Sequence, residues 1–329
     1  MTVINGIEID DINFKVNALK LALNNNTPIE DKLNVIVVIS NPCLYARRYQ
    51  LFNQFINRMN EDDNIRIYVV ELAYKNQKFI VTKSNNKNHL QIRSETPLWH
   101  KENMINVAVK KLLPKNYKAF AWVDADIEFE SNTWAMDTLK LLNGYNDVVQ
   151  LFSHAVDMDK DESTLNVFSS FGYNFSKQKR FGPGKPSDFW HPGFAWAITR
   201  KAYEKMGGIY EKGILGSGDN IMAFSFINKC QHYTNEKYHE DYNNSMLKFQ
   251  EKAKQLRLGY VPGVIRHHYH GKKKNRYYHE RTHILVNHQF SPNKDITHDS
   301  NDLIIPTSNF SQDFKNDIMN YFIERKEDE

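Results

Sequence analysis

The stretch Phe120-Ala-Trp-Val-Asp-Ala-Asp-Ile-Glu-Phe129 joins an apolar run to a pair of carboxylates. Its aromatic and β-branched start is typical of a buried strand. On an extended strand, Asp124 and Asp126 would project toward the same side and repel each other unless a cation lay beside them. Carboxylate oxygens suit Mg²⁺ or Mn²⁺, so the pair predicts a metal site at a strand end. The alternative for this short motif is a solvated turn that opens the next helix.

Strands and helices alternate before this stretch. Continuous apolar runs at 33–40 and 64–74 predict buried strands, and residues 45–59 between them carry apolar side chains at helical spacing. A second helix is expected over 98–113, directly before the central strand. This order predicts an α/β fold with a mostly parallel central sheet flanked by helices.

Other segments follow less regular patterns. Residues 79–82 and 89–92 flank a polar turn and predict a hairpin, while the polar segment 153–188 predicts a surface excursion. A single strand is expected over 260–269. Near the end of the chain, apolar residues at helical spacing predict a C-terminal helix that packs by one face; they are Phe314, Ile318, Tyr321 and Phe322.

Composition excludes several classes of protein. The 329 residues are 41% hydrophobic and 25% charged, as in ordinary globular domains, and the net charge of +4 is too small to favour nucleic-acid binding. The apolar run 35–39 is too short for a transmembrane segment, and no signal-peptide pattern precedes it. Cys43 and Cys230 are isolated, which favours neither a disulfide framework nor a thiolate zinc site. We therefore expect a cytoplasmic protein without a nucleic-acid partner.

Several motifs, taken in order, resemble those of nucleotide-sugar-dependent glycosyltransferases of the GT-A fold. A helix bearing Lys101 precedes a strand that ends in Asp-x-Asp. The other motifs are Val69-Val70-Glu71, the segment from Gly193 to Ala197, Gly218-Asp219, and His267-x-x-His-Gly271 with Arg276. Each motif alone is weak, but their order over roughly residues 33–290 is much more specific. The resemblance implies a GT-A-like fold and a metal-dependent transferase.

The resemblance also implies a metal site. Asp126 would hold Mn²⁺ or Mg²⁺, Asp124 would help with the metal or the ribose, and a late histidine would complete the site. On an extended strand His268 and His270 share one face, while His267 points away. We favour His270, because the glycine after it lets the backbone approach a diphosphate, and keep His268 as the second candidate.

Basic residues flank these metal-ligand candidates in the sequence. Lys272, Lys273 and Arg276 follow the histidines directly, and Lys101 lies on the helix before the central strand. The resemblance implies that they hold the diphosphate of the donor, and that Glu71 accepts hydrogen bonds from its ribose or base. The alternatives are a solvated charge run or a nucleic-acid patch for the lysines, and an ordinary exposed carboxylate for Glu71.

Asp219 is the candidate catalytic residue. It follows Gly216-Ser-Gly218 and precedes an apolar helix, where an Asp often serves as an N-cap. The resemblance implies that it takes the proton from the acceptor hydroxyl, and its two oxygens allow both roles. His191 and Trp196 would flank the sugars, because aromatic faces pack on pyranose rings; core packing is the alternative for Trp196.

The sequence thus predicts a glycosyltransferase that moves a hexose from a nucleoside diphosphate sugar, with UDP preferred, to a hydroxyl group of a glycan or another acceptor. The alternatives are an inactive sugar- or nucleotide-binding protein and another metal-dependent phosphate-handling enzyme. An aspartyl phosphatase, for example, carries Asp-x-Asp but expects Thr or Val at the position of Glu128.

The expected domain organisation has three parts. Residues 1–30 form an N-terminal segment, and residues 31–290 form the transferase domain. That domain divides into a nucleotide-sugar half (31–130) and an acceptor half (131–290). Residues 291–329 form a C-terminal extension with a docking helix.

Overall fold

The computed structural model describes residues 2–4, 7–9, 27–179, 190–278 and 280–329. Most of the expected N-terminal segment therefore lies outside the described residues. The part that is described includes a short antiparallel pair, β1 (Thr2–Ile4) and β2 (Ile7–Ile9).

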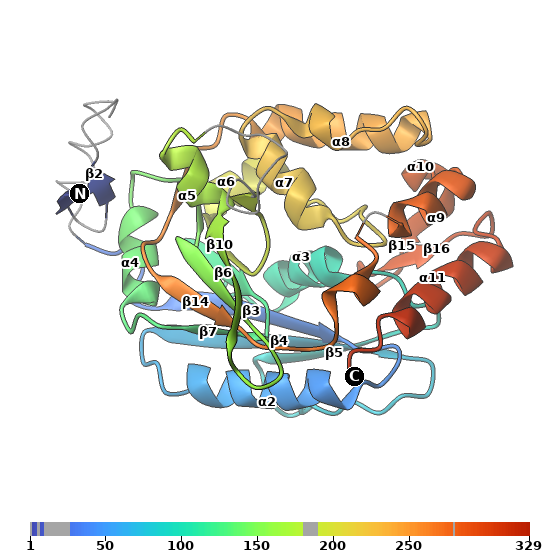
Figure 1. The fold of residues 1–329 in the computed structure, drawn as a ribbon, viewed down its shortest axis with the longest axis horizontal. Helices are drawn as coiled ribbons and strands as arrows, with labels where there is room; N and C mark the ends of the chain where they lie inside the picture. Colours follow the sequence, from blue (N-terminus) through green and yellow to red (C-terminus); the bar gives the residue numbers. More distant parts are fainter. Residues whose placement is uncertain (1, 5–6, 10–26, 180–189, 279) are drawn as a thin grey trace.

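A seven-stranded sheet forms the centre of the molecule (Figure 1). Its strands are β3 (Leu33–Ser40), β4 (Ile65–Tyr74), β5 (His89–Ser94), β6 (Ala119–Val123), β8 (Val148–Gln150), β12 (Ala195–Thr199) and β13 (Leu258–Tyr260). Their order is β13–β8–β12–β6–β3–β4–β5. Every neighbouring pair is parallel except the two that involve β12, which runs antiparallel to β6 and β8. The predicted mostly parallel sheet is confirmed.

Helices cover both faces of this sheet because its strands are apolar on both sides. Val35 and Val37 of β3 pack in one core with the helices α2 (Ala46–Met59) and α4 (Trp134–Leu141). Ile36, between them, packs in the other core. That core also contains side chains of α3 (Lys101–Lys111), α6 (Arg200–Met206), α7 (Gly218–Phe226), α8 (Glu240–Ala253) and α11 (Gln312–Glu324). Figure 1 shows α2 and α3 on opposite sides of the sheet.

A second, five-stranded sheet lies beside the first and positions the site. Its strands are β7 (Ile127–Phe129), β9 (His154–Met158), β10 (Thr164–Ser170), β11 (Trp190–His191) and β14 (Val264–His267), in the order β11–β10–β9–β14–β7. The expected surface excursion over 153–188 is therefore wrong in part, since it contains β9, β10 and helix α5 (Phe171–Ser176). Residues 180–189 of that segment lie outside the described ranges.

Two other local predictions are corrected. Strand β5 pairs in parallel with β4, so residues 79–82 and 89–92 do not form a hairpin. The expected strand over 260–269 is two strands, β13 in the large sheet and β14 in the small one. The break falls at Pro262 and Gly263: proline lacks a backbone donor, and the φ of Gly263 is +149°.

The C-terminal segment supplies the predicted helix α11. Ser311 caps it by accepting a hydrogen bond from the backbone nitrogen of Phe314 at 3.1 Å. All four residues of the predicted apolar face are buried. The shorter elements nearby are η2 (Cys230–His232), η3 (Lys273–Arg276), α9 (Arg281–Asn287), α10 (Pro292–Asp295), β15 (Ile296–His298) and β16 (Ile304–Pro306). Across the described ranges, no helix has the length and apolar character needed to cross a bilayer.

Candidate active site

The carboxylate pair lies where the chain passes from the large sheet to the small one. The backbone nitrogen of Asp124 donates to the carbonyl of Phe194 at 2.8 Å, and the chain then turns at residues 125–126 before β7 begins. This turn ends the strand alternation, so the two carboxylates have different partners. Asp124 forms an ion pair with Lys101, whereas Asp126 faces His267 and His270.

Asp126, His267 and His270 form a compact group of potential metal ligands, with one ligand atom of each within 4.8 Å of the others. Oδ2 of Asp126 lies 2.9 Å from Nε2 of His270 and 3.7 Å from Nε2 of His267. The other oxygen, Oδ1, is buried without a hydrogen-bond partner among the described residues. A bound cation would satisfy that oxygen, so these residues fit a divalent ion. One carboxylate with two imidazoles suits Mn²⁺ better than Mg²⁺, which prefers oxygen ligands.

Behind His267 lies Asp157, a residue that no motif in the sequence indicates. The two are register partners on β14 and β9, so their side chains share one face of the sheet. Nδ1 of His267 donates to Oδ1 of Asp157 at 2.6 Å, which leaves Nε2 directed at Asp126. Burial by itself would lower the pKa of His267, but the Asp126 and Asp157 carboxylates raise it. Such a carboxylate fixes the tautomer and orientation of a ligating histidine.

The prediction that His267 points away is wrong, and His268 is not brought into the ligand group. Strand β14 ends at His267, so the strand alternation does not extend to the next residues. The backbone nitrogen of His268 donates to the carbonyl of Asp126 at 2.8 Å, and its Nε2 lies 3.3 Å from Glu128. His270 returns toward Asp126 because the chain after β14 is irregular.

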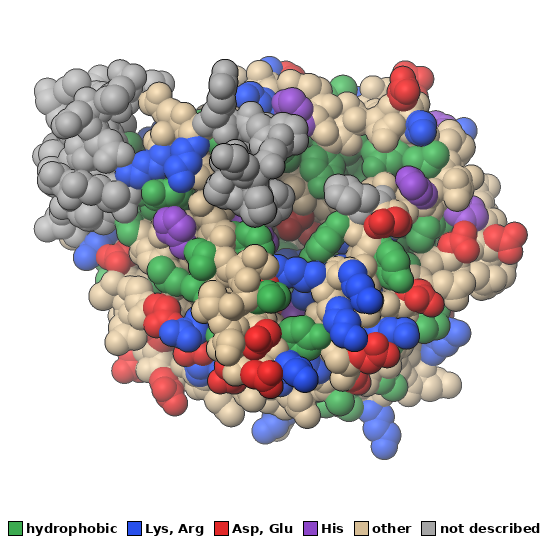
Figure 2. Space-filling model, in the orientation of Figure 1, with side chains coloured by type: hydrophobic (Ala, Val, Ile, Leu, Met, Phe, Trp, Pro, Cys, Tyr) green, Lys and Arg blue, Asp and Glu red, His purple; other side chains and the backbone are tan. Residues whose placement is uncertain are grey.

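A cavity of about 550 Å³ opens beside the ligand group, and its lining includes residues from both sheets and from α3, α7 and α11. Figure 2 shows Lys and Arg side chains gathered beside a hollow on this face. The basic residues that line the cavity are Arg48, Lys101, Lys273, Arg276, Arg281 and Arg325. Five carboxyl groups line it as well, those of Glu102, Asp124, Asp126, Asp157 and Asp219. Basic side chains next to a metal-ligand group are suited to a phosphate-bearing ligand.

Of the four predicted diphosphate-binding residues, three line the cavity and one does not. Lys273 contacts Asp157 at 2.5 Å, Arg276 donates to Nε2 of His270 at 2.8 Å, and both line the cavity. Lys101 also lines the cavity, where its ammonium group forms an ion pair with Asp124. Burial opposes the charge of Lys101, but the Asp124 carboxylate keeps the pKa of Lys101 above its usual range. Lys272 is exposed and lies outside the cavity lining.

Asp219 lies in the first turn of α7 and lines the cavity. The N-cap of this helix is Ser217, so the capping role considered for Asp219 is not the one observed. Its Oδ1 accepts a hydrogen bond from the backbone nitrogen of Asn220 at 2.8 Å. Among the described residues, Oδ2 has no hydrogen-bond partner, and it lies close to Gly193, where a Cβ atom would be 3.2 Å away. The hydrogen bond to Oδ1 therefore orients the carboxylate, and Oδ2 is available to a ligand in the cavity.

Glu102, next to Lys101 on α3, also lines the cavity and was not selected from the sequence. It is 5% exposed, and its carboxyl group packs against Gly218, where a Cβ atom would lie 2.6 Å from Cδ of Glu102. Burial raises the pKa of Glu102 to about 8. A glycine at 218 is therefore required for the start of α7 to approach this carboxyl group.

Two predicted site residues have structural roles instead. The carboxylate of Glu71 accepts hydrogen bonds from the backbone nitrogens of residues 80–82 and from the hydroxyl of Thr82, so it fixes this segment on β4 and does not line the cavity. Trp196 is 1% exposed, donates through Nε1 to the carbonyl of Pro192 at 2.7 Å and packs against Phe226. For Trp196 the core-packing alternative is the one observed.

His191 lines the cavity, and its predicted contact with a sugar stays a prediction. Its ring stacks on Phe194 with centroids 4.1 Å apart and an angle of 8° between the planes. Burial, together with the positive charges of His267 and Lys273, lowers the pKa of His191 to about 3. The ring is thus a neutral, flat wall of the cavity at physiological pH.

Fold and cavity together define this chain as an α/β protein with a candidate divalent-metal site at the junction of two sheets. No family model and no curated protein sequence matches it. Its structure is similar to solved glycosyltransferases.

One such structure is the catalytic domain of Drosophila beta-1,4-galactosyltransferase 7 with xylobiose, at 10% identity and a TM-score of 0.36, covering 70% of this chain and 65% of that one. Another is a mannosyltransferase from Pyrobaculum calidifontis with GDP-mannose and Mn²⁺, at 12% identity and a TM-score of 0.42, covering 79% of this chain and 63% of that one.

A mutant of the same Drosophila enzyme, with manganese, UDP-galactose and xylobiose, has 9% identity and a TM-score of 0.39, covering 84% of this chain and 94% of that one. The chain thus spans less than two thirds of the first two structures. Identity and TM-score are low throughout, so the site of this chain, and not these similarities, indicates its function.

Proposed function

We propose that this chain is a Mn²⁺-dependent glycosyltransferase that moves a hexose from a nucleoside diphosphate sugar, with UDP as the nucleotide, to a hydroxyl group of a glycan or another acceptor. The observation that carries the proposal is the group of Asp126, His267 and His270. Among the described residues, Oδ1 of Asp126 is buried without a hydrogen-bond partner, beside a cavity that Lys273 and Arg276 also line. The carboxylate of Asp219, held through Oδ1 by the backbone nitrogen of Asn220, also lines that cavity.

The chemistry of this reaction needs negative charge to be stabilised on the departing diphosphate. A Mn²⁺ ion held by Asp126, His267 and His270 would supply a Lewis acid for that charge. Lys273 and Arg276 line the same part of the cavity and add positive charge where the leaving group develops its own. Lys101 is held by Asp124, which keeps its ammonium group at the edge of the site.

We assign Asp219 as the general base of an inverting transfer. Its Oδ1 is held by the backbone nitrogen of Asn220, so Oδ2 is the oxygen available to accept the proton of the acceptor hydroxyl. The neutral His191 ring, stacked on Phe194, offers a flat surface to a sugar ring near this carboxylate. The cavity lining also includes Gly193 between these groups, where a side chain would crowd both His191 and Asp219.

Thermal unfolding in a panel of nucleoside diphosphate sugars, with and without Mn²⁺, tests the proposal. A ligand that binds only the folded state raises the melting temperature by mass action. We expect a UDP-sugar to raise it only when Mn²⁺ is present, and Mg²⁺ to be a poorer substitute. A panel without any nucleotide-dependent shift contradicts the proposal.

A turnover assay separates the alternatives. Release of UDP from the stabilising donor in the presence of sugar acceptors is expected. Mn²⁺-dependent UDP binding without release of UDP would instead identify a sugar- or nucleotide-binding protein without catalysis. Release of inorganic phosphate from simple phosphate esters, without sugar transfer, would identify a phosphatase.

A further inference from the structure

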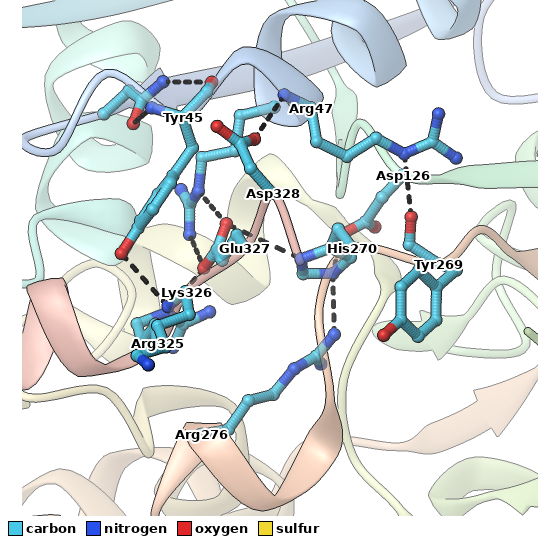
Figure 3. Close-up of polar contacts among 12 residues, drawn as sticks. Tyr45, Arg47, Asp126, Tyr269, His270, Arg276, Arg325, Lys326, Glu327 and Asp328 are labelled. Carbon is cyan, nitrogen blue, oxygen red and sulfur yellow. Dashed lines mark hydrogen bonds and ion pairs between the residues drawn. The ribbon is translucent and has the colours of Figure 1, made fainter. Parts of the chain in front are cut away.

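The residues that follow α11 run back into the candidate active site. Asp328 accepts hydrogen bonds from the backbone nitrogens of Ala46 and Arg47, at 3.0 and 2.8 Å, and thereby caps the start of α2. The backbone nitrogen of Lys326 donates to the hydroxyl of Tyr45 at 3.1 Å. Figure 3 shows this C-terminal segment, residues 325–328, between α2 and the loop that carries His270.

This segment packs directly on the loop of His270. Gly271 has a φ of +83°, and a Cβ atom there would lie 2.9 Å from the Cα atom of Glu327. Arg47, whose backbone is capped by Asp328, donates through Nε to the carbonyl of Tyr269 at 2.9 Å. The loop therefore makes close backbone contact with the C-terminal segment and a hydrogen bond to α2, the helix to which Asp328 joins that segment.

Glu327 is the residue of this segment that faces the metal-ligand group. It is 2% exposed, and its carboxylate accepts from Arg48 at 2.8 Å and from Arg325 at 2.5 Å. Its Oε2 also lies 3.6 Å from Nδ1 of His270, on the side of the ring opposite Asp126. That distance is longer than a hydrogen bond, so the contact is electrostatic in this structure.

Each histidine of the group has a carboxylate on the side of Nδ1, hydrogen-bonded to His267 and at a longer, electrostatic distance from His270. Asp157 lies behind Nδ1 of His267, and Glu327 lies behind Nδ1 of His270. In both cases Nε2 is the nitrogen that faces Asp126. A carboxylate behind a ligating imidazole holds the proton on the far nitrogen and makes the near nitrogen a better ligand.

We infer that Glu327 is a positioning residue of the metal site: it orients His270 so that Nε2 and Asp126 bind the ion together. This inference rests on the proposed function, because it assumes the metal site. It assigns the C-terminal segment a functional role, since Arg48 and Arg325 hold the carboxylate in place and Asp328 anchors the segment on α2.

Mn²⁺ binding to the full chain, followed by electron paramagnetic resonance of the free ion without nucleotide, tests the inference. Glu327→Gln keeps the shape of the side chain and removes its charge. We expect it to weaken Mn²⁺ binding on the order of 10-fold or more. Glu329→Gln, which removes a charge at the exposed residue next to this segment, is expected to leave Mn²⁺ affinity unchanged.

A second variant separates positioning from simple docking of the segment. Asp328→Ala removes both hydrogen bonds to α2 but leaves the carboxylate of Glu327 behind His270. We therefore expect its melting temperature to fall and its Mn²⁺ affinity to fall less than that of Glu327→Gln. Unchanged Mn²⁺ affinity in Glu327→Gln overturns the inference, as does an equal loss of affinity in Asp328→Ala. A parent chain that binds no Mn²⁺ overturns the proposed metal site as well.

Discussion

Arg276 donates a hydrogen bond to Nε2 of His270 at 2.8 Å, and the same nitrogen lies 2.9 Å from Oδ2 of Asp126. One imidazole nitrogen offers either a lone pair or a proton, so it cannot accept from Arg276 and donate to Asp126 at once. Coordination through Nε2 would occupy the lone pair, and Arg276 would lose its acceptor. The guanidinium group would then be free for a ligand in the cavity that it already lines.

This relationship predicts opposite effects of Arg276→Ala on two ligands. Mn²⁺ alone should bind as tightly as in the parent or more tightly, because a competing donor is removed from His270. UDP in the presence of Mn²⁺ should bind on the order of 10-fold more weakly, because a charge-assisted phosphate contact is lost.

Isothermal titration with each ligand measures both affinities. Lys272→Ala, in the same basic run but exposed and outside the cavity, serves as the control and should change neither. A parallel loss of Mn²⁺ and UDP binding in Arg276→Ala would refute the competition between Arg276 and the metal.

Asp219→Asn tests the assignment of the base. An asparagine can still accept the hydrogen bond from the backbone nitrogen of Asn220, so the fold and donor binding should be preserved. It cannot accept a proton, so we expect transfer to slow by about 100-fold or more. Initial rates at saturating donor, compared with donor affinity, provide the measurement. Near-normal turnover would exclude Asp219 as the base.

Glu102 predicts a pH-dependent stability effect. Burial raises its pKa to about 8, above the value of about 4.3 expected in the unfolded chain. The folded state therefore binds the proton more tightly, and the parent loses stability as pH rises through this interval.

Glu102→Gln removes that loss. Relative to the parent, the variant should gain a few kcal/mol, in order of magnitude, between about pH 5 and about pH 9. Urea unfolding without metal or nucleotide at both pH values gives the comparison, with exposed Glu61→Gln as the control. A pH-independent difference between Glu102→Gln and the parent would show that this carboxyl group does not titrate as described.

The sheet and its main helices could be predicted from the sequence because they depend on local pattern. Apolar runs in β3 and β4 and the helical stripe of α2 are short-range signals, and right-handed connections leave few arrangements for them. The hairpin expected at residues 79–92 failed because β5 pairs with β4 over a longer separation, while Glu71 draws residues 80–82 onto the sheet.

The positions of Asp126, His270 and Asp219 at the cavity could be predicted from local motifs, while their roles stay predictions. The candidate site was not predictable where contacts come from chain segments far apart. Asp157 reaches His267 only through the pairing of β9 with β14, and Glu327 reaches His270 from the end of the chain. Strand alternation predicts that His268 faces Asp126 and that His267 points away. The opposite is observed, because β14 ends at His267 and the alternation does not continue past it.

The central claim is that Asp126 anchors a metal ion required for nucleotide binding. Titration of UDP into the parent and into Asp126→Ala, each with and without Mn²⁺, tests it most directly. The account predicts Mn²⁺-dependent UDP binding by the parent and by the exposed-site control Asp63→Ala. It predicts none by Asp126→Ala, whose folding is checked by circular dichroism. UDP binding by Asp126→Ala that still depends on Mn²⁺ would contradict it.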